Sequence, residues 1–323
     1  LKTLTSFNAN KLGITNLTGL EHCTNLVELH LWDNQISDIS ALANLTNLSK
    51  LESAWNQIND ISALANLTKL SFLHLSQNQI SDLSALANLI NLKDLDFTDN
   101  QISDISALAN LTKLTDLYLG KNQIGDITAL AKLTSLKMID IGENRVEDLT
   151  PLQNLTELER LSIHNSRIKD IAPLTGLTNL KYLHLDNNAF SDITSIKGLH
   201  HLESLHLNGN RIIDIQPLRN LKFLRELNLK NNRITDITPL LQDGGISNTI
   251  RLNGNPLSNE SIVTHIPALT ASGIKVEFNI PEDLAKQIEK NKKDGVVNIP
   301  DLNLRSALEK ALGKNEGDVI TKE

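Results

Sequence analysis

The chain has 323 residues, of which 59 are leucine and 37 are asparagine, whereas aromatic residues make up only 3%. With 40% apolar and 21% charged residues it can bury a core, so a disordered chain is excluded. No apolar run approaches the roughly 18 residues of a membrane span, and the net charge of −7 argues against binding duplex nucleic acid. One cysteine excludes a disulfide framework. This excess of leucine and asparagine indicates internal repetition.

Asparagine recurs every 22 residues through most of the chain. Each recurring asparagine lies in the same frame of apolar residues, and Ser166 breaks the series, with Asn165 one place early. A degenerate copy of the frame comes first, with Leu12 at its asparagine position. A fixed period of this length is typical of a stacked repeat array. The recurring residues are Asn34, Asn56, Asn78, Asn100, Asn122, Asn144, Asn188, Asn210 and Asn232.

One repeat predicts a short strand followed by a single helical turn. Leu29 and Leu31 alternate with residues of other kinds, and this period of two predicts a strand that turns both leucines inward. Asp38 precedes the sequence Ser-Ala-Leu-Ala and is predicted to be the N-cap of the helical turn. Later repeats have a proline three residues after the aspartate, where it costs least. These are Pro151, Pro173, Pro217 and Pro239.

A single repeat leaves its apolar face open, so it is expected to be stable only when stacked on its neighbours. We assign residues 1–243 to an array of about ten regular 22-residue units with a degenerate unit in front. Residues 244–278 hold the last unit, displaced by one residue after Gly245, and a C-terminal cap that ends in a closing strand at 273–278. Residues 279–296 are charged and are predicted to be a linker with a short helix.

The pattern L-x-x-L-x-L-x-x-N-x-I-x-D-I-x-x-L resembles the leucine-rich repeat. The sequence of the repeat, N-Q-I-S-D-I-S-A-L-A-N-L-T, is similar to the repeats of the bacterial internalin and SDS22-like class, and this resemblance covers residues 1 to about 278. The resemblance implies an α/β solenoid shaped as a horseshoe, with a parallel β-sheet on the concave face and short 3-10 or α turns on the convex face. It also implies a binding module rather than an enzyme.

Residues 297–323 form a separate segment, in which a predicted helix starts at Asp301 and ends before Gly313. The stretch 297–313 looks like the N-terminal cap that precedes leucine-rich repeats in many bacterial surface proteins. We interpret 297–323 as the start of a following array, so that the chain would be part of a longer protein with several modules. A tail helix that docks on its own array is the alternative.

The two polar columns that recur in every repeat are interpreted as structural. Asparagine side chains satisfy backbone groups in the tight turn after each strand, and the aspartates begin the helical turns. A catalytic carboxylate would occur once rather than ten times. Cys23 takes a leucine position of the frame and is predicted to be buried.

The strand positions that point away from the core vary between repeats and form three columns on the predicted concave face. Both tyrosines and Trp32 lie in these columns with Phe72, and Trp55 lies just beyond, at the rim. Large aromatic side chains on a solvent-facing sheet are typical of binding hot spots. The candidate ligand-binding residues are His30, Trp32, Trp55, Phe72, His74, Asp94, Asp96, Asp116, Tyr118, Asp140, Tyr182, His184 and His206.

Charge gives two further candidate features. Residues 1–150 hold 10 Lys/Arg against 17 Asp/Glu, whereas residues 151–278 hold 13 against 12. An acidic patch on the middle strands could receive a basic partner or Ca²⁺, although a solvated acidic face is the simpler interpretation. His164, His184 and His206 lie on successive strands, which makes a zinc site geometrically possible, but strand proximity alone explains their spacing. The acidic residues are Asp94, Asp96, Asp99, Asp116, Asp140 and Glu143.

Enzyme signatures such as G-x-S-x-G, H-E-x-x-H and G-x-x-x-x-G-K-[ST] are absent from the sequence. We predict a non-catalytic module, without cofactor or metal, that recognises a protein or glycan ligand through its concave face. We expect a monomer that is secreted or displayed on a bacterial cell surface, with no nucleic-acid partner and no membrane insertion. The alternative is an intracellular regulatory scaffold similar to SDS22-type phosphatase partners.

Overall fold

The structure, a computed structural model, describes residues 1–241 and 248–293. Within them, thirteen three-residue strands form one parallel sheet in chain order. The strands are β1 (Ser6–Asn8), β2 (Glu28–His30), β3 (Lys50–Glu52), β4 (Phe72–His74), β5 (Asp94–Asp96), β6 (Asp116–Tyr118), β7 (Met138–Asp140), β8 (Arg160–Ser162), β9 (Tyr182–His184), β10 (Ser204–His206), β11 (Glu226–Asn228), β12 (Thr249–Arg251) and β13 (Lys275–Glu277).

The register of the sheet follows the sequence period. From β1 to β11 each residue pairs with the residue 22 positions later, as Glu28 does with Lys50. Glu226 pairs with Thr249, one residue beyond the period, so the displacement predicted after Gly245 is confirmed. The array is therefore the predicted leucine-rich repeat solenoid.

A single short helical turn follows most strands. Eleven of these turns are 3-10 helices. The 3-10 helices are η1 (Leu20–His22), η2 (Ser40–Leu42), η3 (Ser62–Leu64), η4 (Ser84–Leu86), η5 (Ser106–Leu108), η6 (Thr128–Lys132), η7 (Thr150–Leu152), η8 (Ala172–Gly176), η9 (Thr194–Gly198), η10 (Gln216–Leu218) and η11 (Thr238–Leu240).

The aspartate column stabilises these turns, but from one position earlier than predicted. Ile39, not Asp38, is the N-cap of η2, and Asp38 Oδ1 accepts the backbone N–H of Ser40 at 2.8 Å. The same bond recurs at all ten aspartates from Asp38 to Asp236. A carboxylate that accepts from the amide two residues later forms an Asx turn, so the N-cap assignment was wrong by one residue, while the structural role stays.

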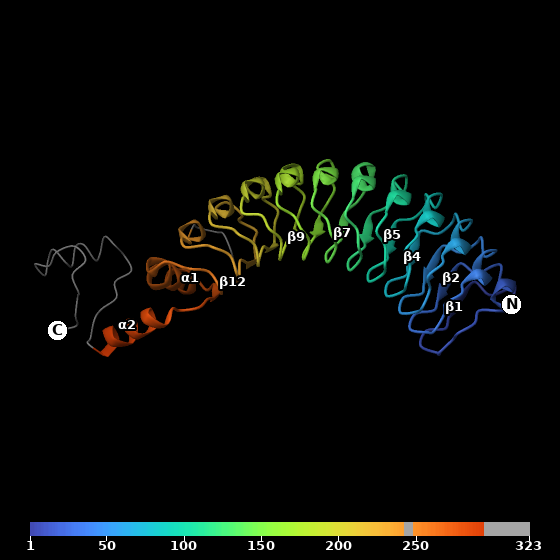
Figure 1. Ribbon diagram of the computed structural model, residues 1–323, viewed down its shortest axis with the longest axis horizontal. Coiled ribbons are helices and arrows are strands. Elements are labelled where there is room, and N and C mark those ends of the chain that lie inside the picture. The colour runs from blue at the N-terminus through green and yellow to red at the C-terminus, as the bar shows by residue number, and fades with distance from the viewer. Residues whose placement is uncertain (242–247, 294–323) are drawn as a thin grey trace, which may run out of the picture.

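The array is a curved ribbon, with the helical turns on the outer, convex side and the strands on the inner, concave side (Figure 1). The leucine and isoleucine positions of the frame are buried between these two layers, as Leu29, Leu31 and Ile36 are at 0% exposure. Cys23 is buried with them, as predicted. Two phenylalanines, Phe97 and Phe190, also lie in this core, so not all aromatics are outside.

The asparagine column joins each coil to the one before it. Asn100 Nδ2 donates to the carbonyl of Phe97 in its own coil and to that of Leu75 in the preceding coil. Its Oδ1 accepts the backbone N–H of Ile80, also in the preceding coil, at 3.0 Å. The ladder is incomplete at two places. At Ser166 the buried Oγ has no partner and the amide of Val146 finds no side-chain acceptor, and at Asn210 the buried Oδ1 has no partner although its Nδ2 still donates to two coils.

Two helical segments and a closing strand follow β12, in the region for which a C-terminal cap is predicted. A π-helical turn η12 (Ser261–His265) leads into α1 (Ile266–Ala271), and β13 closes the sheet. Their apolar residues Ile262, Ile266 and Leu269 cover the last coil and are buried. Helix α2 (Glu282–Lys293) occupies most of the predicted charged linker. The predicted cap-like segment 297–323 lies outside the described residues.

No helix in the described part of the chain combines the length and the apolar character that a membrane crossing needs.

Replacement of one asparagine of the ladder is expected to be costly, and repair of the gap is expected to be stabilising. Asn100→Ala leaves one buried N–H and two buried carbonyls without their side-chain partner, so we expect a loss of about 3 kcal/mol in the free energy of unfolding. Ser166→Asn supplies an acceptor for Val146, and we expect a gain of about 1 kcal/mol. Urea unfolding followed by circular dichroism measures both; a destabilised Ser166→Asn variant would contradict the proposed role of the ladder.

Candidate functional site

The concave sheet face carries the side chains that vary between repeats. Its strand register aligns them as predicted, so that Asp96, Tyr118 and Asp140 are direct neighbours on β5, β6 and β7. All thirteen candidate residues lie on this face or, in the case of Trp55, at its rim. Their positions are those predicted from the sequence, and their role in binding stays a prediction.

Near the N-terminal end, polar and aromatic side chains hold one another in fixed positions. His30 Nδ1 lies 2.6 Å from Glu52, and Lys50 lies 2.8 Å from the same carboxylate. Although burial opposes it, these hydrogen bonds from Lys50 and His30 hold the pKa of Glu52 below its usual value. Lys50 also lies over the ring of Phe72, with Nζ 4.5 Å from the ring centroid. These contacts fix the side chains of His30, Lys50, Glu52 and Phe72 relative to one another.

The two tryptophans differ in environment. Trp32 is half-buried, and Lys11 lies over its ring at 4.3 Å. Trp55 is 56% exposed and has a left-handed backbone conformation, with φ of 56°. The equivalent residues of other repeats share this conformation, but they include Asn187 and Gly209, which adopt it at low cost. The coil imposes this conformation on residues of other types as well, among them Lys11, Gln77, Lys121 and Glu143. Trp55 differs from them in its large exposed ring.

Tyr118 lies at the centre of the acidic patch. Its ring is half-buried, and its register neighbours Asp96 and Asp140 flank it on both sides. Burial, together with the charges of Asp116 and Asp94, raises the pKa of the Tyr118 hydroxyl. No Lys or Arg in the described ranges forms an ion pair with these carboxylates, and His74 contacts only Asp94, at 2.9 Å, so Asp96, Asp116 and Asp140 have no ion-pair partner there.

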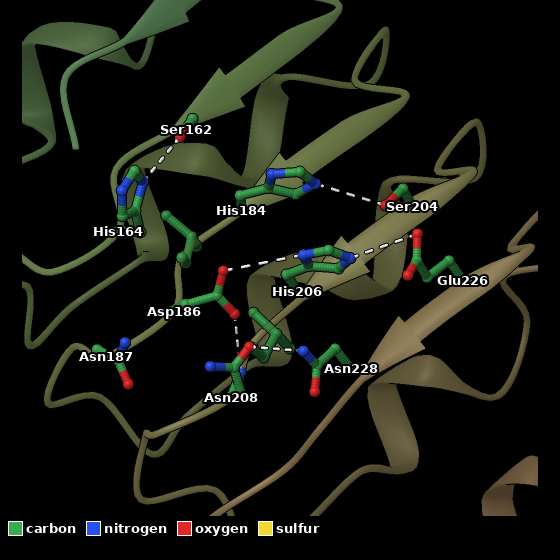
Figure 2. A network of polar contacts seen from close by, with 12 residues as sticks. Ser162, His164, His184, Asp186, Asn187, Ser204, His206, Asn208, Glu226 and Asn228 are labelled. Atoms are coloured by element: carbon green, nitrogen blue, oxygen red, sulfur yellow. Dashed lines mark hydrogen bonds and ion pairs between the residues drawn. The ribbon is translucent and has the colours of Figure 1, made fainter. Parts of the chain in front are cut away.

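The C-terminal half of the face carries a polar network around two histidines (Figure 2). The rings of His184 and His206 stack, with centroids 4.1 Å apart and planes 6° from parallel. His206 lies between two carboxylates, at 3.9 Å from Asp186 and 3.5 Å from Glu226. His164 instead bonds Ser162 at 3.1 Å, so the third histidine does not join the stack.

Ionisation within the network follows from burial. Desolvation, with the neighbouring His206 second, lowers the pKa of His184 from 6.5 to about 4, so the ring is neutral at physiological pH. Burial likewise raises the pKa of Asp186. Beyond Glu226 the ion pairs continue through Arg251 to Glu277 on the closing strand. The network thus connects the concave face to the closing strand β13.

Several residues of this face were not among the predicted candidates. Lys50 and Arg160 each lie over the aromatic ring that is their register partner on the next strand, Phe72 and Tyr182 respectively. A cation 22 residues before an aromatic residue in the same column is the sequence signal for such a pair. No comparable sequence signal marks Asp186, Glu226 and Arg251. Each contacts a partner that lies in another column or on another strand, and the period alone does not predict such contacts.

A metal site, or a hollow that could hold a small ligand, would indicate chemistry beyond protein binding in the described ranges. No group of three or more His, Cys, Asp or Glu residues there is placed to hold a metal ion. Hollows between successive helical turns are lined by the aspartate column, as by Asp60 and Asp82. Because they recur with the repeat, they are a consequence of the coil spacing.

Comparison with known families identifies the class of protein. Models described as "Leucine Rich repeats (2 copies)" and "Leucine Rich repeat" match the array, and the chain belongs to the leucine-rich repeat proteins. The first matches residues 90–132, 112–154, 134–176, 156–198 and 200–242, and the second 22–43 and 66–87. A search of curated proteins finds no match.

Solved structures narrow the class to the internalin-like proteins. An internalin (inlF) from Listeria monocytogenes is 34% identical with a TM-score of 0.74, over 87% of this chain and 88% of that one. Internalin C2 (inlC2) from the same species is 38% identical with a TM-score of 0.51, over 62% and 79%. The plant peptide hormone receptor RGFR1, solved in complex with RGF2, shares the fold at 24% identity and a TM-score of 0.66, over 80% and 44%. The predicted internalin-like leucine-rich repeat fold is confirmed, and with it a class of generally non-catalytic, protein-binding scaffolds.

Trp55 is expected to lower the stability of the chain. Trp55→Asn removes a bulky residue from a left-handed position that Asn187 occupies in another repeat, so we expect the free energy of unfolding to rise by about 1 kcal/mol. Urea unfolding measures the change, with Gln77→Asn at the same position of the next repeat as a control that should change stability less. If Trp55→Asn were destabilising, the tryptophan would be held by packing rather than kept despite strain.

His184 is expected to make stability depend on pH. Because its pKa is lowered in the fold, the unfolded chain binds more protons between pH 6.5 and about 4, and stability falls as pH decreases through this window. Asp186 has a raised pKa, so its contribution to stability falls as pH rises above its usual pKa, opposite to that of His184. Asp186 is present in both the wild-type chain and the His184→Phe variant, so its effect cancels in the comparison. His184→Phe keeps a stacking ring without the titration, so its unfolding free energy should fall less on acidification. Equal pH profiles would show that His184 titrates normally. The charged or titratable groups that act on His184 are His206, Glu226, His164 and Asp140.

Proposed function

We propose that the chain is a non-catalytic receptor module that binds a protein ligand on its concave face, as part of a bacterial surface or secreted protein. The observation that carries this proposal is the set of large aromatic side chains on a solvent-facing sheet whose fold requires none of them. Leucine and isoleucine, with Phe97 and Phe190, already fill most of the buried positions, so an outward aromatic residue gives the array no core packing. Aromatic residues contribute disproportionately to binding energy at protein interfaces.

The order of the face supports the same proposal. Trp32, Phe72 and Tyr182 each lie against a cation, and His30 and His74 are each held by a carboxylate. A surface whose side chains are already fixed loses little conformational entropy when a partner binds. Rigid curved sheets of this kind suit a folded protein surface better than a small molecule, which needs an enclosed site.

The surface or secreted location rests on the relatives. The internalins from Listeria monocytogenes come from a bacterium and cover most of the chain at 34% identity or more. A glycan ligand is a weaker candidate, because cations already cover three of the five aromatic rings that a sugar would stack against. The intracellular scaffold, similar to SDS22-type phosphatase partners, is the alternative to test.

Loss of the aromatic side chains is expected to abolish ligand binding without unfolding the array. The variant Trp32→Thr, Phe72→Ser and Tyr118→Ser introduces residue types that other repeats carry in the same columns, at Thr98, Ser204 and Ser162. We would screen purified extracellular domains and a protein phosphatase catalytic subunit against the wild-type chain by biolayer interferometry. For each partner found, we expect the variant to bind at least about 100-fold more weakly, because interface hot spots contribute 2 kcal/mol or more each.

A second triple variant provides the matched control. Ile90→Thr, Ile213→Thr and Phe223→Asn remove three exposed apolar side chains that lie outside the concave columns, again for residues found at the same positions of other repeats. This variant should bind as the wild type does. A partner that is lost by the control variant but kept by the concave variant would contradict the proposal, and binding to the phosphatase alone would favour the intracellular alternative.

A further inference from the structure

Arg160 lies on the concave face in a different situation from the other cations that cover aromatic rings. Its guanidinium carbon lies 4.1 Å from the centroid of the Tyr182 ring, on the neighbouring strand, and its side chain is exposed. Within residues 1–241 and 248–293 no carboxylate forms an ion pair with it. By contrast, Lys11 pairs with Asp33 at 3.9 Å and Lys50 with Glu52 at 2.8 Å.

The surroundings of Arg160 give it no ion-pair contact within the described residues, although its charge acts on the neighbouring Glu159. The nearest carboxylate in sequence, Glu159, is bound by Lys181 at 2.7 Å. The register neighbours of Arg160 on β7 and β9 are Met138 and Tyr182, and neither carries a charge at neutral pH. An unpaired guanidinium on a face that is otherwise rich in internal ion pairs is therefore available to an external anion.

Stacking prepares this guanidinium for one kind of contact. A guanidinium has five N–H donors, all in its plane, and a ring that covers one face leaves the edges free. No side-chain hydrogen bond of Arg160 occurs among the described residues, so these donors point to solvent. Two parallel N–H groups match the two oxygens of a carboxylate, and the Tyr182 ring fixes the plane in which they lie.

We propose that Arg160, positioned by Tyr182, is the docking point for an aspartate or glutamate side chain of the protein ligand, next to an apolar residue that contacts Met138. This inference rests on the proposed function, because it assigns a partner chemistry to the same face. Met138 is the single methionine of the chain and lies beside Arg160 in the register, where its flexible thioether can adapt to an apolar side chain.

Charge on the neighbouring strands favours a carboxylate over a phosphate or a nucleic acid. Asp116 and Asp140 lie on β6 and β7, on one side of Arg160, and the first 150 residues carry a net charge of 10 − 17 = −7. A polyanion would be repelled there, whereas one carboxylate placed toward β9 avoids most of this repulsion. The net charge is thus −7 over residues 1–150 but only 13 − 12 = +1 over residues 151–278, so a partner that spans this boundary meets less repulsion if it presents its acidic group on the β8 side.

The probe for the experiment is a capped tripeptide, acetyl-Leu-Glu-Leu-amide, with acetyl-Leu-Gln-Leu-amide as the uncharged equivalent. The ¹⁵N-labelled chain is titrated with each peptide, and the side-chain Nε–H of every arginine is followed by NMR. We expect the glutamate peptide to shift the Arg160 resonance and the backbone amides of β7 to β9 at millimolar concentration. The glutamine peptide is expected to shift them much less.

Variants separate the fork geometry from the charge. Arg160→Lys keeps the charge but lacks the two-pronged edge, so we expect binding at least about fivefold weaker, whereas Tyr182→Phe keeps the ring and should bind as the wild type does. Tyr182→Leu removes the positioning ring, and we expect an intermediate loss. The matched control is Arg145→Gln, since Arg145 is exposed and has no carboxylate partner but bonds only Gln123 and covers no ring.

Several results would overturn the assignment. These are equal shifts at Arg145 and Arg160, equal affinity of the Arg160→Lys variant, or a stronger shift of Arg160 with inorganic phosphate than with the glutamate peptide. The outcome is independent of the screen described above. If a protein partner is found and lost with the aromatic variant while the peptide fails at Arg160, the carboxylate assignment alone is wrong; if no partner is found but Arg160 binds the peptide, the failure lies with the proposed function.

Discussion

The structure depends on one hydrogen-bonding constraint, the asparagine side chain that follows nearly every strand. Each turn buries backbone groups that no helix or strand can satisfy, and the asparagine amide bonds a carbonyl of its own coil together with a carbonyl and an N–H of the preceding coil. The bond therefore fixes both the turn and the spacing of neighbouring coils. Leucine and isoleucine supply most of the burial energy, but apolar packing has no direction, and the asparagines provide the register.

This constraint divides every repeat into fixed and free positions. The coil requires the inward leucines, the asparagine and the turn aspartate, because they pack the core or bond the backbone. The outward strand positions face solvent and contribute no core packing. Selection for a ligand can act there without loss of fold. Most of the aromatic rings, the acidic group around Tyr118 and the unpaired Arg160 lie at such positions, and the acidic group and Arg160 differ in charge. A long partner surface would thus meet distinct chemistry at the two ends of the array.

Much of this arrangement could be predicted because the period converts sequence distance into spatial distance. A step of 22 residues places Asp96 beside Tyr118 in every conformation that keeps the register, and so the columns, the acidic patch and the neighbouring histidines were all predictable. The sequence did not predict features that depend on side-chain rotamers or on the backbone conformation of single residues. The stack of His184 on His206, the cover of Lys11 on Trp32 and the left-handed backbone of Trp55 depend on which way a side chain or peptide turns.

The sequence by itself determined the repeat length, the buried frame, the one-residue displacement before β12 and the identity of the exposed columns. Each follows from periodicity, because a residue that recurs at a fixed step occupies a fixed place in a stacked coil. Only the tertiary structure decided which charges are compensated, since that depends on the reach of long side chains across strands. Lys50 forms an ion pair with Glu52, whereas Arg160 lies over an aromatic ring and pairs with no carboxylate among the described residues. The first side chain therefore orders the face, and the second is free to bind an external group.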